Sequence, residues 1–356
     1  MGERRNLNLG NRARTCYDRV GMAEYTPPFH VSATAIRMVA EISSLVERYA
    51  IRMESPEGLM LRKANRIKTI RSSLAIEGNE LSEEEVRTMM EGKVVVAPKQ
   101  QLHEVRNAIR TYEDSSTWDA YRVEDMLAAH ASMMQGLCPE PGQFRKGGVG
   151  VFAGEKLIHM APPAHLVPTL MQQLFAWLQH AEDHLLIRSC VFHYEFEFIH
   201  PFSDGNGRIG RLWQSLILSK LNPVFPLLPV ENMVYTRQTG YYRAIEESTA
   251  RGDSSPFIDF MLGEILRSLQ QAVAAPVAVP TLSDTERYIA TYLRKIPSAT
   301  ARELAAQRGI SLRQIEKLLN DMKKKAVLLR VGARRNGVWK VLIPPDNPSA
   351  KGKDSV

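Results

Sequence analysis

The chain has 356 residues, of which 44% are hydrophobic and 24% are charged, a composition typical of soluble globular proteins. This length exceeds what one compact core usually holds, so we expect two or three domains. No window approaches the roughly 18 uncharged apolar residues of a membrane span, and the N-terminus lacks the apolar run of a signal peptide. Three widely spaced cysteines indicate neither a disulfide framework nor a cysteine metal site. The composition therefore predicts a cytoplasmic protein with no membrane partner.

The net charge of +7 is concentrated near the C-terminus. Residues 284–343 contain 14 Lys plus Arg and 5 Asp plus Glu, a balance of +9, which leaves −2 for the rest of the chain. A local positive excess of this kind is typical of nucleic-acid-binding modules.

In chain order, residues 1–29 are polar and irregular, and we expect a flexible N-terminal arm. Apolar residues at helical spacing predict helices from Ser32 and over 56–76, the second ending at Gly78, which suits a left-handed C-cap. Ser82, followed by three glutamates, predicts the N-cap of the next helix. Further helical segments are expected over residues 101–113, 124–136, 168–180, 185–199 and 208–221.

Strand signals are scarce before residue 280. Residues 149–160 contain two short extended runs around Gly154-Glu155-Lys156, which predicts a hairpin. Small residues and two prolines over 272–280 indicate an interdomain linker, and the polar residues 344–356 predict a disordered tail.

The basic region between the linker and the tail resembles a winged helix. Helices are expected over 284–295, 301–308 and 312–324, followed by a hairpin of 327–331 and 338–343. In this interpretation basic residues of the third helix and of the wing face DNA. These residues are Arg313, Lys317, Lys323, Lys324, Lys325, Arg334 and Arg335. Docking of another protein on the same module remains an open alternative.

Positions 200–211 read His-Pro-Phe-Ser-Asp-Gly-Asn-Gly-Arg-Ile-Gly-Arg. Pro201 should end the preceding helix, because proline disfavours helix for the residue before it and donates no hydrogen bond. The run from Asp204 to Gly207 can form a nest of backbone N–H groups, and a helix begins directly after it. A nest at a helix N-terminus is a binding site for anions.

The charged residues of this stretch favour a nucleotide polyphosphate as the anion. Arg208 and Arg211 share a face of the first helical turn, where the helix dipole disfavours cations unless an anion is bound. Guanidinium groups match phosphate oxygens well. Asp204 could then hold Mg²⁺, and a neutral His200 could accept a proton from an attacking hydroxyl.

The twelve residues match, without a departure, the His-x-Phe-x-(Asp/Glu)-Gly-Asn-Gly-Arg-x-x-Arg signature of Fic (filamentation induced by cAMP) domains, and in organisation the chain resembles this family from about residue 30 to 270. Fic domains are all-helical enzymes that usually transfer AMP from ATP to protein hydroxyls. The resemblance implies His200 as general base, Phe202 as buried anchor and Asp204 as Mg²⁺ ligand. It also implies phosphate contacts from Gly205, Asn206, Gly207, Arg208 and Arg211.

Two flanking segments agree with this resemblance. The hairpin at 149–160 resembles the family's flap, on which an extended segment of the target protein docks by strand addition. Tyr241 and Tyr242, followed by Gly252-Asp253, resemble the segment that walls the adenine pocket, with Tyr242 contacting the nucleotide. An ordinary surface hairpin, and core packing for the tyrosines, remain alternatives.

A third segment, from Ser73 to Asn79, resembles the inhibitory motif (Ser/Thr)-x-x-x-Glu-(Gly/Asn) of many Fic proteins. The resemblance implies that Glu77 pairs with Arg211 and removes the clamp on the γ-phosphate of ATP. The alternative is a glutamate that is merely exposed beside the helix C-cap.

We therefore expect a mainly α protein, a helical bundle with a small β-hairpin flap and a C-terminal winged helix-turn-helix. The expected parts are an arm (1–29), a helical region with the inhibitory helix (30–110), a Fic core (111–270), a linker (271–283), a winged helix (284–343) and a tail (344–356). The expected activity is AMP transfer from ATP, with Mg²⁺, to a target protein or to the chain itself. Expected partners are the target, DNA and a second copy in a homodimer.

Other functions stay open at this stage. The core could sense nucleotide for a DNA-binding transcription regulator, although an intact His200 argues against a pure sensor. Related Fic enzymes transfer UMP, phosphocholine or a γ-phosphate, and some remove AMP. A hydrolytic metalloenzyme is disfavoured because no further cluster of metal ligands is evident.

Overall fold

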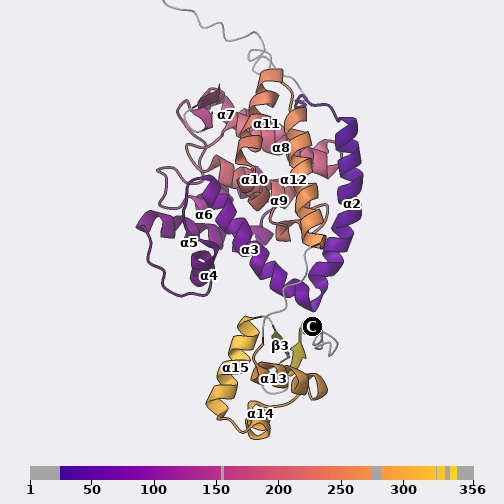
Figure 1. Ribbon diagram of the computed structural model, residues 1–356. Helices are drawn as coiled ribbons and strands as arrows, with labels where there is room; N and C mark the ends of the chain where they lie inside the picture. The colour runs from indigo at the N-terminus through magenta and orange to yellow at the C-terminus, as the bar shows by residue number, and fades with distance from the viewer. Residues whose placement is uncertain (1–24, 154–155, 275–281, 326, 333–336, 343–356) are drawn as a thin grey trace, which may run out of the picture. The chain divides into compact units, whose positions relative to one another are not determined.

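The computed structural model describes residues 25–153, 156–274, 282–325, 327–332 and 337–342 (Figure 1). Within these ranges, residues 25–49 and 65–273 form one compact unit, called unit 1, and residues 50–64 and 282–342 form a second, called unit 2. The structure is mainly α, as the sequence predicted, with one antiparallel hairpin in each unit. None of the described helices is long and apolar enough to cross a membrane.

Of the α-helices described before residue 275, the sequence predicted the first eight in this order and did not predict the last three. The helices are α2 (Ala33–Glu54), α3 (Pro56–Ile76), α4 (Glu83–Met90), α5 (Lys99–Asp114), α6 (Val123–Met133), α7 (Val167–His180), α8 (Leu185–Ile199), α9 (Asn206–Ser219), α10 (Val230–Thr236), α11 (Gln238–Arg251) and α12 (Ser255–Ala274). Ser82 caps α4 through a capping box, and Gly78 has a φ of 89° after α3. The predicted boundary at residue 110 falls within α5.

Helix α8 is the centre of unit 1. Apolar residues surround its whole circumference, a pattern of helices buried on all sides, and its aromatic residues Phe192 and Phe196 are fully buried. Figure 1 shows α8 and α9 between α2 on one side and α4, α5 and α6 on the other. Phe175 of α7 meets Phe192 edge to face, with ring centroids 5.2 Å apart. The residues at the end of α8 are therefore delivered to a fixed place in the core.

The predicted hairpin is present beside this core. Strands β1 (Gly150–Ala153) and β2 (Lys156–Met160) pair antiparallel, with a register irregularity between Val151 and Phe152. His159 Nε2 lies 2.9 Å from the carbonyl oxygen of Phe198, and the two rings stack with centroids 4.7 Å apart. These contacts attach the hairpin to the last turn of α8.

The last residues of the segment predicted as a flexible arm are bound to unit 1. Tyr25 donates a hydrogen bond from its hydroxyl to Glu195 Oε2 at 2.8 Å, and Phe29 meets Trp177 edge to face. Pro28 accepts a hydrogen bond from the backbone N–H of Ser254. Residues 1–24 of the predicted arm lie outside the described residues.

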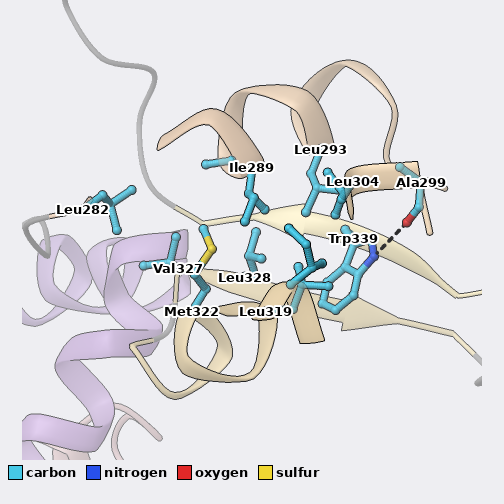
Figure 2. Packing of buried hydrophobic residues seen from close by; sticks show 12 residues of the cluster. Leu282, Ile289, Leu293, Ala299, Leu304, Leu319, Met322, Val327, Leu328 and Trp339 are labelled. Carbon is cyan, nitrogen blue, oxygen red and sulfur yellow. Dashed lines mark hydrogen bonds between the residues drawn. The ribbon is translucent and has the colours of Figure 1, made fainter. Parts of the chain in front are cut away.

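The C-terminal part of unit 2 contains the predicted succession of three helices and a hairpin. These elements are α13 (Asp284–Lys295), α14 (Ala301–Arg308), α15 (Leu312–Lys324), β3 (Leu328–Val331) and β4 (Val338–Val341). Capping boxes at Ser283, Thr300 and Ser311 begin the three helices. Figure 2 shows apolar residues of these helices and of the hairpin packed in one cluster, with Trp339 toward one side; its indole N–H donates to the Ala299 carbonyl at 3.1 Å. Assignment to the winged-helix family stays a prediction.

Some predictions for this region differ from the structure or fall outside it. Helix α12 continues to Ala274, past the start of the predicted linker at 271, and residues 275–281 are outside the described part. Lys325 was expected to face nucleic acid, but its ammonium group is 2.6 Å from Glu286 Oε1. The wing arginines at 334 and 335 and the predicted tail at 344–356 lie outside the described residues.

The core of unit 2 should be sensitive to single truncations. Leu304 of α14 is fully buried, and we expect Leu304→Ala to lower the free energy of unfolding by about 2–5 kcal/mol, because it leaves a cavity. Hydrogen–deuterium exchange of peptides from 284–342, followed through a urea series, measures this loss. Leu312→Ala is the matched control, since Leu312 is 36% exposed. Equal losses in both variants would contradict the packing described.

Candidate active site

His200 occupies the C-cap of α8 in a left-handed conformation. Its φ is 50°, a positive value shared by no other non-glycine residue among those described. Such a conformation is uncommon for non-glycine residues and needs support from its surroundings. The backbone N–H of His200 donates to the Phe196 carbonyl at 2.9 Å, and Pro201 prevents further helix. The turn presents a side chain that is 21% exposed.

Arg145 holds this turn from outside the motif. The side chain is buried, and its guanidinium donates to the carbonyls of Gly147, Pro162, Ile199 and His200 at 2.5–3.2 Å. A cation at the carboxyl end of a helix is also favoured by the helix dipole. Because Gly147 precedes β1 and Pro162 follows β2, Arg145 joins both ends of the hairpin to His200. No pattern in the local sequence pointed to this residue.

The loop after His200 is closed by Phe202 and Asn206. Phe202 is fully buried, as predicted for an anchor, and its ring stacks on His130 with centroids 3.7 Å apart. The side-chain amide of Asn206 donates to the Phe202 carbonyl and accepts from the Phe202 N–H, both at 2.9 Å. These bonds use the amide oxygen and one N–H of the Asn206 side chain within the loop. This side chain holds the loop.

His130 is a second support that the motif does not contain. The Gly142 N–H donates to His130 Nδ1 at 2.8 Å, so the proton of the neutral ring is on Nε2, which lies 3.0 Å from the Asp204 carbonyl. Burial lowers the pKa of His130 to about 4, which keeps the ring neutral. The signal in the sequence was a histidine on the apolar face of α6, between Met126 and Met133.

Glycine is required at position 205. Gly205 is the N-cap of α9 with a φ of 83°, and a Cβ there would lie 2.7 Å from the sulfur of Met134. The backbone N–H of Gly205 donates to Asp204 Oδ1 at 2.6 Å. The first N–H groups of α9 have no partner within the helix, as at any helix start, so they are available to an anion.

The two arginines of the motif differ in what they contact. Arg208 is buried and donates from Nη2 to Asp204 Oδ1 at 3.2 Å, while its Nε has no hydrogen-bond partner among the described residues. A buried donor without a protein partner can donate to a ligand oxygen. Asp204 itself is 57% exposed. Asp204 thus stands beside an incompletely satisfied guanidinium, with Oδ1 engaged by Gly205 and Arg208 and the second carboxylate oxygen left for a ligand.

Arg211 is held by the end of α3 through its Nε and Nη2. Its Nη2 donates to Glu77 Oε1 at 2.7 Å and to the Ser73 carbonyl at 2.9 Å, and its Nε donates to Ser73 Oγ at 3.3 Å. Burial by itself would lower the pKa of Arg211, but Glu77, Tyr241 and Glu197 together raise that pKa above its ordinary value. A Cβ on Gly207 would lie 2.5 Å from Glu77 Oε1, so the pair needs glycine there. Glu77 therefore sits against the predicted phosphate cradle.

The two adjacent tyrosines of α11 have different surroundings: one is packed in the core and the other lies beside the site. Tyr241 is buried, with its hydroxyl 3.1 Å from His193 Nε2. Tyr242 is half-buried, and its pKa is raised by burial and then by the charge of Glu77. Asp253, in the segment expected near adenine, accepts from the Ser255 N–H and lies 3.0 Å from His30 Nδ1. Tyr242 is thus the member of the pair that can meet a ligand.

Candidate metal ligands are few around this loop. In the described part of the chain no three His, Cys, Asp or Glu side chains gather in a way that could hold a metal ion. A divalent cation at Asp204 would need oxygen ligands from a bound phosphate. This donor set fits Mg²⁺, which commonly binds through one or two carboxylates and substrate phosphates.

Comparisons with known proteins place the chain. The model of the Fic/DOC family matches residues 120–218, which include the hairpin, α8 and the motif. A Fic family protein from Desulfovibrio desulfuricans G20, whose crystal structure is known, is 39% identical and superposes with a TM-score of 0.71 over 91% of this chain and 100% of that chain. The chain belongs to the Fic family.

More distant Fic relatives are named for an activity. Protein adenylyltransferase Fic from Aedes aegypti is 27% identical over 229 residues, which are 60% of this chain and 44% of the relative. Protein adenylyltransferase fic-1 from Caenorhabditis elegans is 26% identical over 258 residues, 69% and 48% of the two chains. The chain thus spans about half the length of these relatives. A structure of C. elegans Fic-1 is 21% identical with a TM-score of 0.54 over 67% of this chain and 73% of that chain, which supports the fold alone.

The neutral state of His130 should be visible in solution. With a pKa of about 4 in the folded protein and an ordinary value of 6.5 when unfolded, the stability that His130 contributes is fully present above about pH 6.5 and is lost as the pH falls toward about 4. We expect the His130 ring to stay neutral, with its proton on Nε2, at pH 5.5 in ¹⁵N-edited NMR spectra. Protonation already near pH 6.5 would contradict the burial that the structure gives this ring.

Proposed function

We propose that this Fic protein is a protein adenylyltransferase that transfers AMP from ATP to a Ser, Thr or Tyr hydroxyl of a target protein or of itself. The observation that carries the proposal is an incomplete anion site next to His200. The first N–H groups of α9, which have no acceptor within the helix, and the Nε of Arg208, unsatisfied within the described part of the chain, stand one loop away from this imidazole. The names of the Fic relatives support the same activity.

In this proposal the phosphates of ATP lie over the start of α9. The N–H groups of Asn206 and Gly207 and the guanidinium of Arg208 bind phosphate oxygens; the Gly205 N–H joins them when it leaves Asp204 Oδ1, and Arg211 joins them when it is free. Tyr242 lies along the adenosine. Asp204 holds Mg²⁺, which neutralises charge on the phosphates and on the pyrophosphate that leaves.

His200 acts as the general base of the transfer. Burial lowers its pKa, so the ring is neutral and able to accept a proton near neutral pH. The acceptor hydroxyl gives its proton to His200, its oxygen forms a bond to the α-phosphorus, and the bond to the β-phosphate oxygen breaks with release of pyrophosphate. An extended segment of the target, paired with the edge of the hairpin at 149–160, would bring the hydroxyl to this place.

Glu77 inhibits this reaction within the same chain. A γ-phosphate and the Glu77 carboxylate compete for one buried guanidinium, that of Arg211, which Ser73 also holds. Without the arginine the triphosphate loses a contact that aligns its α-phosphorus for attack.

Removal of the carboxylate should activate the protein. We expect Glu77→Gly to raise transfer of α-³²P-labelled AMP to protein by about tenfold or more, since a hydrogen bond to a charged group contributes about 1.5–3 kcal/mol. Glu80→Gly is the control, because Glu80 is an exposed glutamate three residues away. Equal labelling by the wild type and Glu77→Gly would exclude the inhibitory role.

The base can be tested in the activated background. We expect His200→Ala combined with Glu77→Gly to abolish labelling, measured together with nucleotide affinity by calorimetry. If labelling persisted while ATP still bound, the proposed role of His200 would be wrong.

We also propose that α15 binds duplex DNA. Arg313, Lys317 and Asn320 are exposed and spaced i, i+4 and i+7, on the face opposite the buried Ile315 and Leu319. Among the described residues, no carboxylate lies within ion-pair distance of Arg313, Lys317 or Lys323. An unneutralised basic helix face in a region of charge +9 is suited to phosphate contacts.

Salt dependence tests this second proposal. We expect Arg313→Ala with Lys317→Ala to weaken binding to duplex DNA and to reduce the slope of log K against log salt by about 2, about 1 for each phosphate contact. Arg302→Ala with Lys340→Ala removes the same charge from other exposed positions of unit 2 and should leave the slope unchanged. Salt-insensitive binding, or none, would favour protein docking.

A further inference from the structure

Glu197 is a buried carboxylate one helical turn before His200, at a position that the motif does not include. Its side chain is 7% exposed, with Oε1 3.8 Å from His193 Nε2 and Oε2 3.9 Å from His200 Nδ1. Among the described residues its Oε1 has no hydrogen-bond partner. Burying an incompletely bonded carboxylate is unfavourable, so packing alone does not account for it.

The neighbouring helix α9 is shaped to admit this carboxylate. A Cβ on Gly210 would lie 2.8 Å from Glu197 Oε1, so any larger residue at 210 would collide with it. Burial would raise the pKa of Glu197, but the imidazoles of His193 and His200 and then the guanidinium of Arg211 hold that pKa below its ordinary value. The carboxylate is therefore ionised beneath the first turn of α9.

The surroundings of His200 determine which ring nitrogen can act as a base. Nδ1 lies 3.4 Å from the Glu197 carbonyl oxygen and 3.9 Å from its carboxylate, and both of these groups can only accept hydrogen bonds. The neutral ring therefore carries its proton on Nδ1 and keeps the lone pair on Nε2.

Charged and titratable groups of other elements also act on this ring. Burial lowers the pKa of His200 most, the nearby Glu197 raises it, Arg145 from the segment before β1 lowers it and Glu77 at the end of α3 raises it. Burial lowers the pKa of His159 of β2, and the nearby charge of His200, when protonated, lowers it further. Glu197 is thus the closest anion to His200 on its own helix.

We propose that Glu197 is the positioning residue of the general base. It keeps the proton of the resting imidazole on Nδ1, and its charge stabilises the imidazolium that forms when Nε2 takes the proton of the acceptor hydroxyl. The hydroxyl oxygen bonds to the α-phosphorus as pyrophosphate leaves, and the imidazolium returns its proton to solvent afterwards. The proton-transfer step rests on the proposed adenylyltransferase function, whereas the coupling of carboxylate and imidazole does not.

The coupling can be measured without any turnover. The full-length protein labelled with ¹³C at histidine Cε1 is titrated by NMR as wild type, Glu197→Gln and Glu195→Gln. We expect the His200 titration to move to lower pH in Glu197→Gln only, because the neutral amide no longer favours the imidazolium. Glu195 controls for an amide placed in the buried part of α8 rather than for loss of charge: it is a buried glutamate two residues earlier that accepts from Tyr25, and burial raises its pKa to about 7.

An unchanged His200 titration in Glu197→Gln would overturn the proposal, as would an equal displacement in Glu195→Gln. If Glu197→Gln does not fold, as judged by circular dichroism, Glu197→Asp replaces it. That variant keeps the negative charge near the ring. The titration midpoint of His200 in Glu197→Asp must therefore be closer to the midpoint in the wild type than to that of histidines in the unfolded chain.

Kinetics in the Glu77→Gly background test the catalytic consequence. We expect Glu197→Gln to lower kcat by about ten- to a hundredfold with an unchanged KM for ATP, because the general base is impaired and the phosphate contacts are kept. A raised KM with an unchanged kcat would show that Glu197 acts through Arg211 instead and would overturn the proposal. If no variant transfers AMP, the adenylyltransferase function fails, and the NMR titration still decides the coupling.

Discussion

The buried guanidinium of Arg145 binds four backbone carbonyls, and the geometry of the site depends on those bonds. Two of the carbonyls end α8, at Ile199 and His200, and the other two flank the hairpin. The left-handed turn at His200 would be unfavourable by itself, and a buried cation surrounded by acceptors compensates for it. The same bonds hold the hairpin next to the His200 imidazole. A target docked on the hairpin would thereby place its hydroxyl group near the base that would deprotonate that hydroxyl.

Below this turn, the loop that would bind phosphate is supported from its protein side. The ring of Phe202 lies between α8 and His130, the amide of Asn206 closes the loop on itself, and His130 accepts and donates in a single neutral form. Because these side chains satisfy the hydrogen-bonding groups of the loop and pack against it, the loop can be rigid before any ligand binds. Rigid donors aimed at a binding site act without further reorganisation.

Arg211 explains why Glu77 and the γ-phosphate of ATP cannot be bound to the same guanidinium at once in the proposed function. A buried guanidinium cannot be left without an anion, because removal of its partner leaves an uncompensated charge. Glu77 satisfies that requirement when no nucleotide is bound, and a γ-phosphate would satisfy it otherwise. Gly207 allows the carboxylate to approach the cradle so closely that both anions would need the same space. The switch therefore needs no large movement of the core.

Several helix boundaries followed from local patterns. The helix over 185–199 has the predicted limits, since Pro201 acts on the residue before it wherever it occurs. Helix α9 begins at Asn206, two residues earlier than expected, because Gly205 supplies the N-cap. Helix α6 ends at Met133, three residues earlier than expected, with Met134 as its C-cap. The observed helix ends differ from the predicted ones where the capping residue is fixed by the path of the chain through the core.

The sequence by itself determined the order of the helices up to residue 221, both hairpins and the Fic signature, because spacing, caps and a contiguous motif are written along the chain, whereas the pairing of Glu77 with Arg211 was implied by family resemblance and is seen in the structure. The tertiary structure alone decided what His130, Arg145 and Glu197 do, and it assigned the Asn206 side chain to the loop. These roles arise from contacts between segments distant in sequence, or from the burial of a charge between two helices. Neither leaves a periodic signal, since both are fixed only when the helices pack.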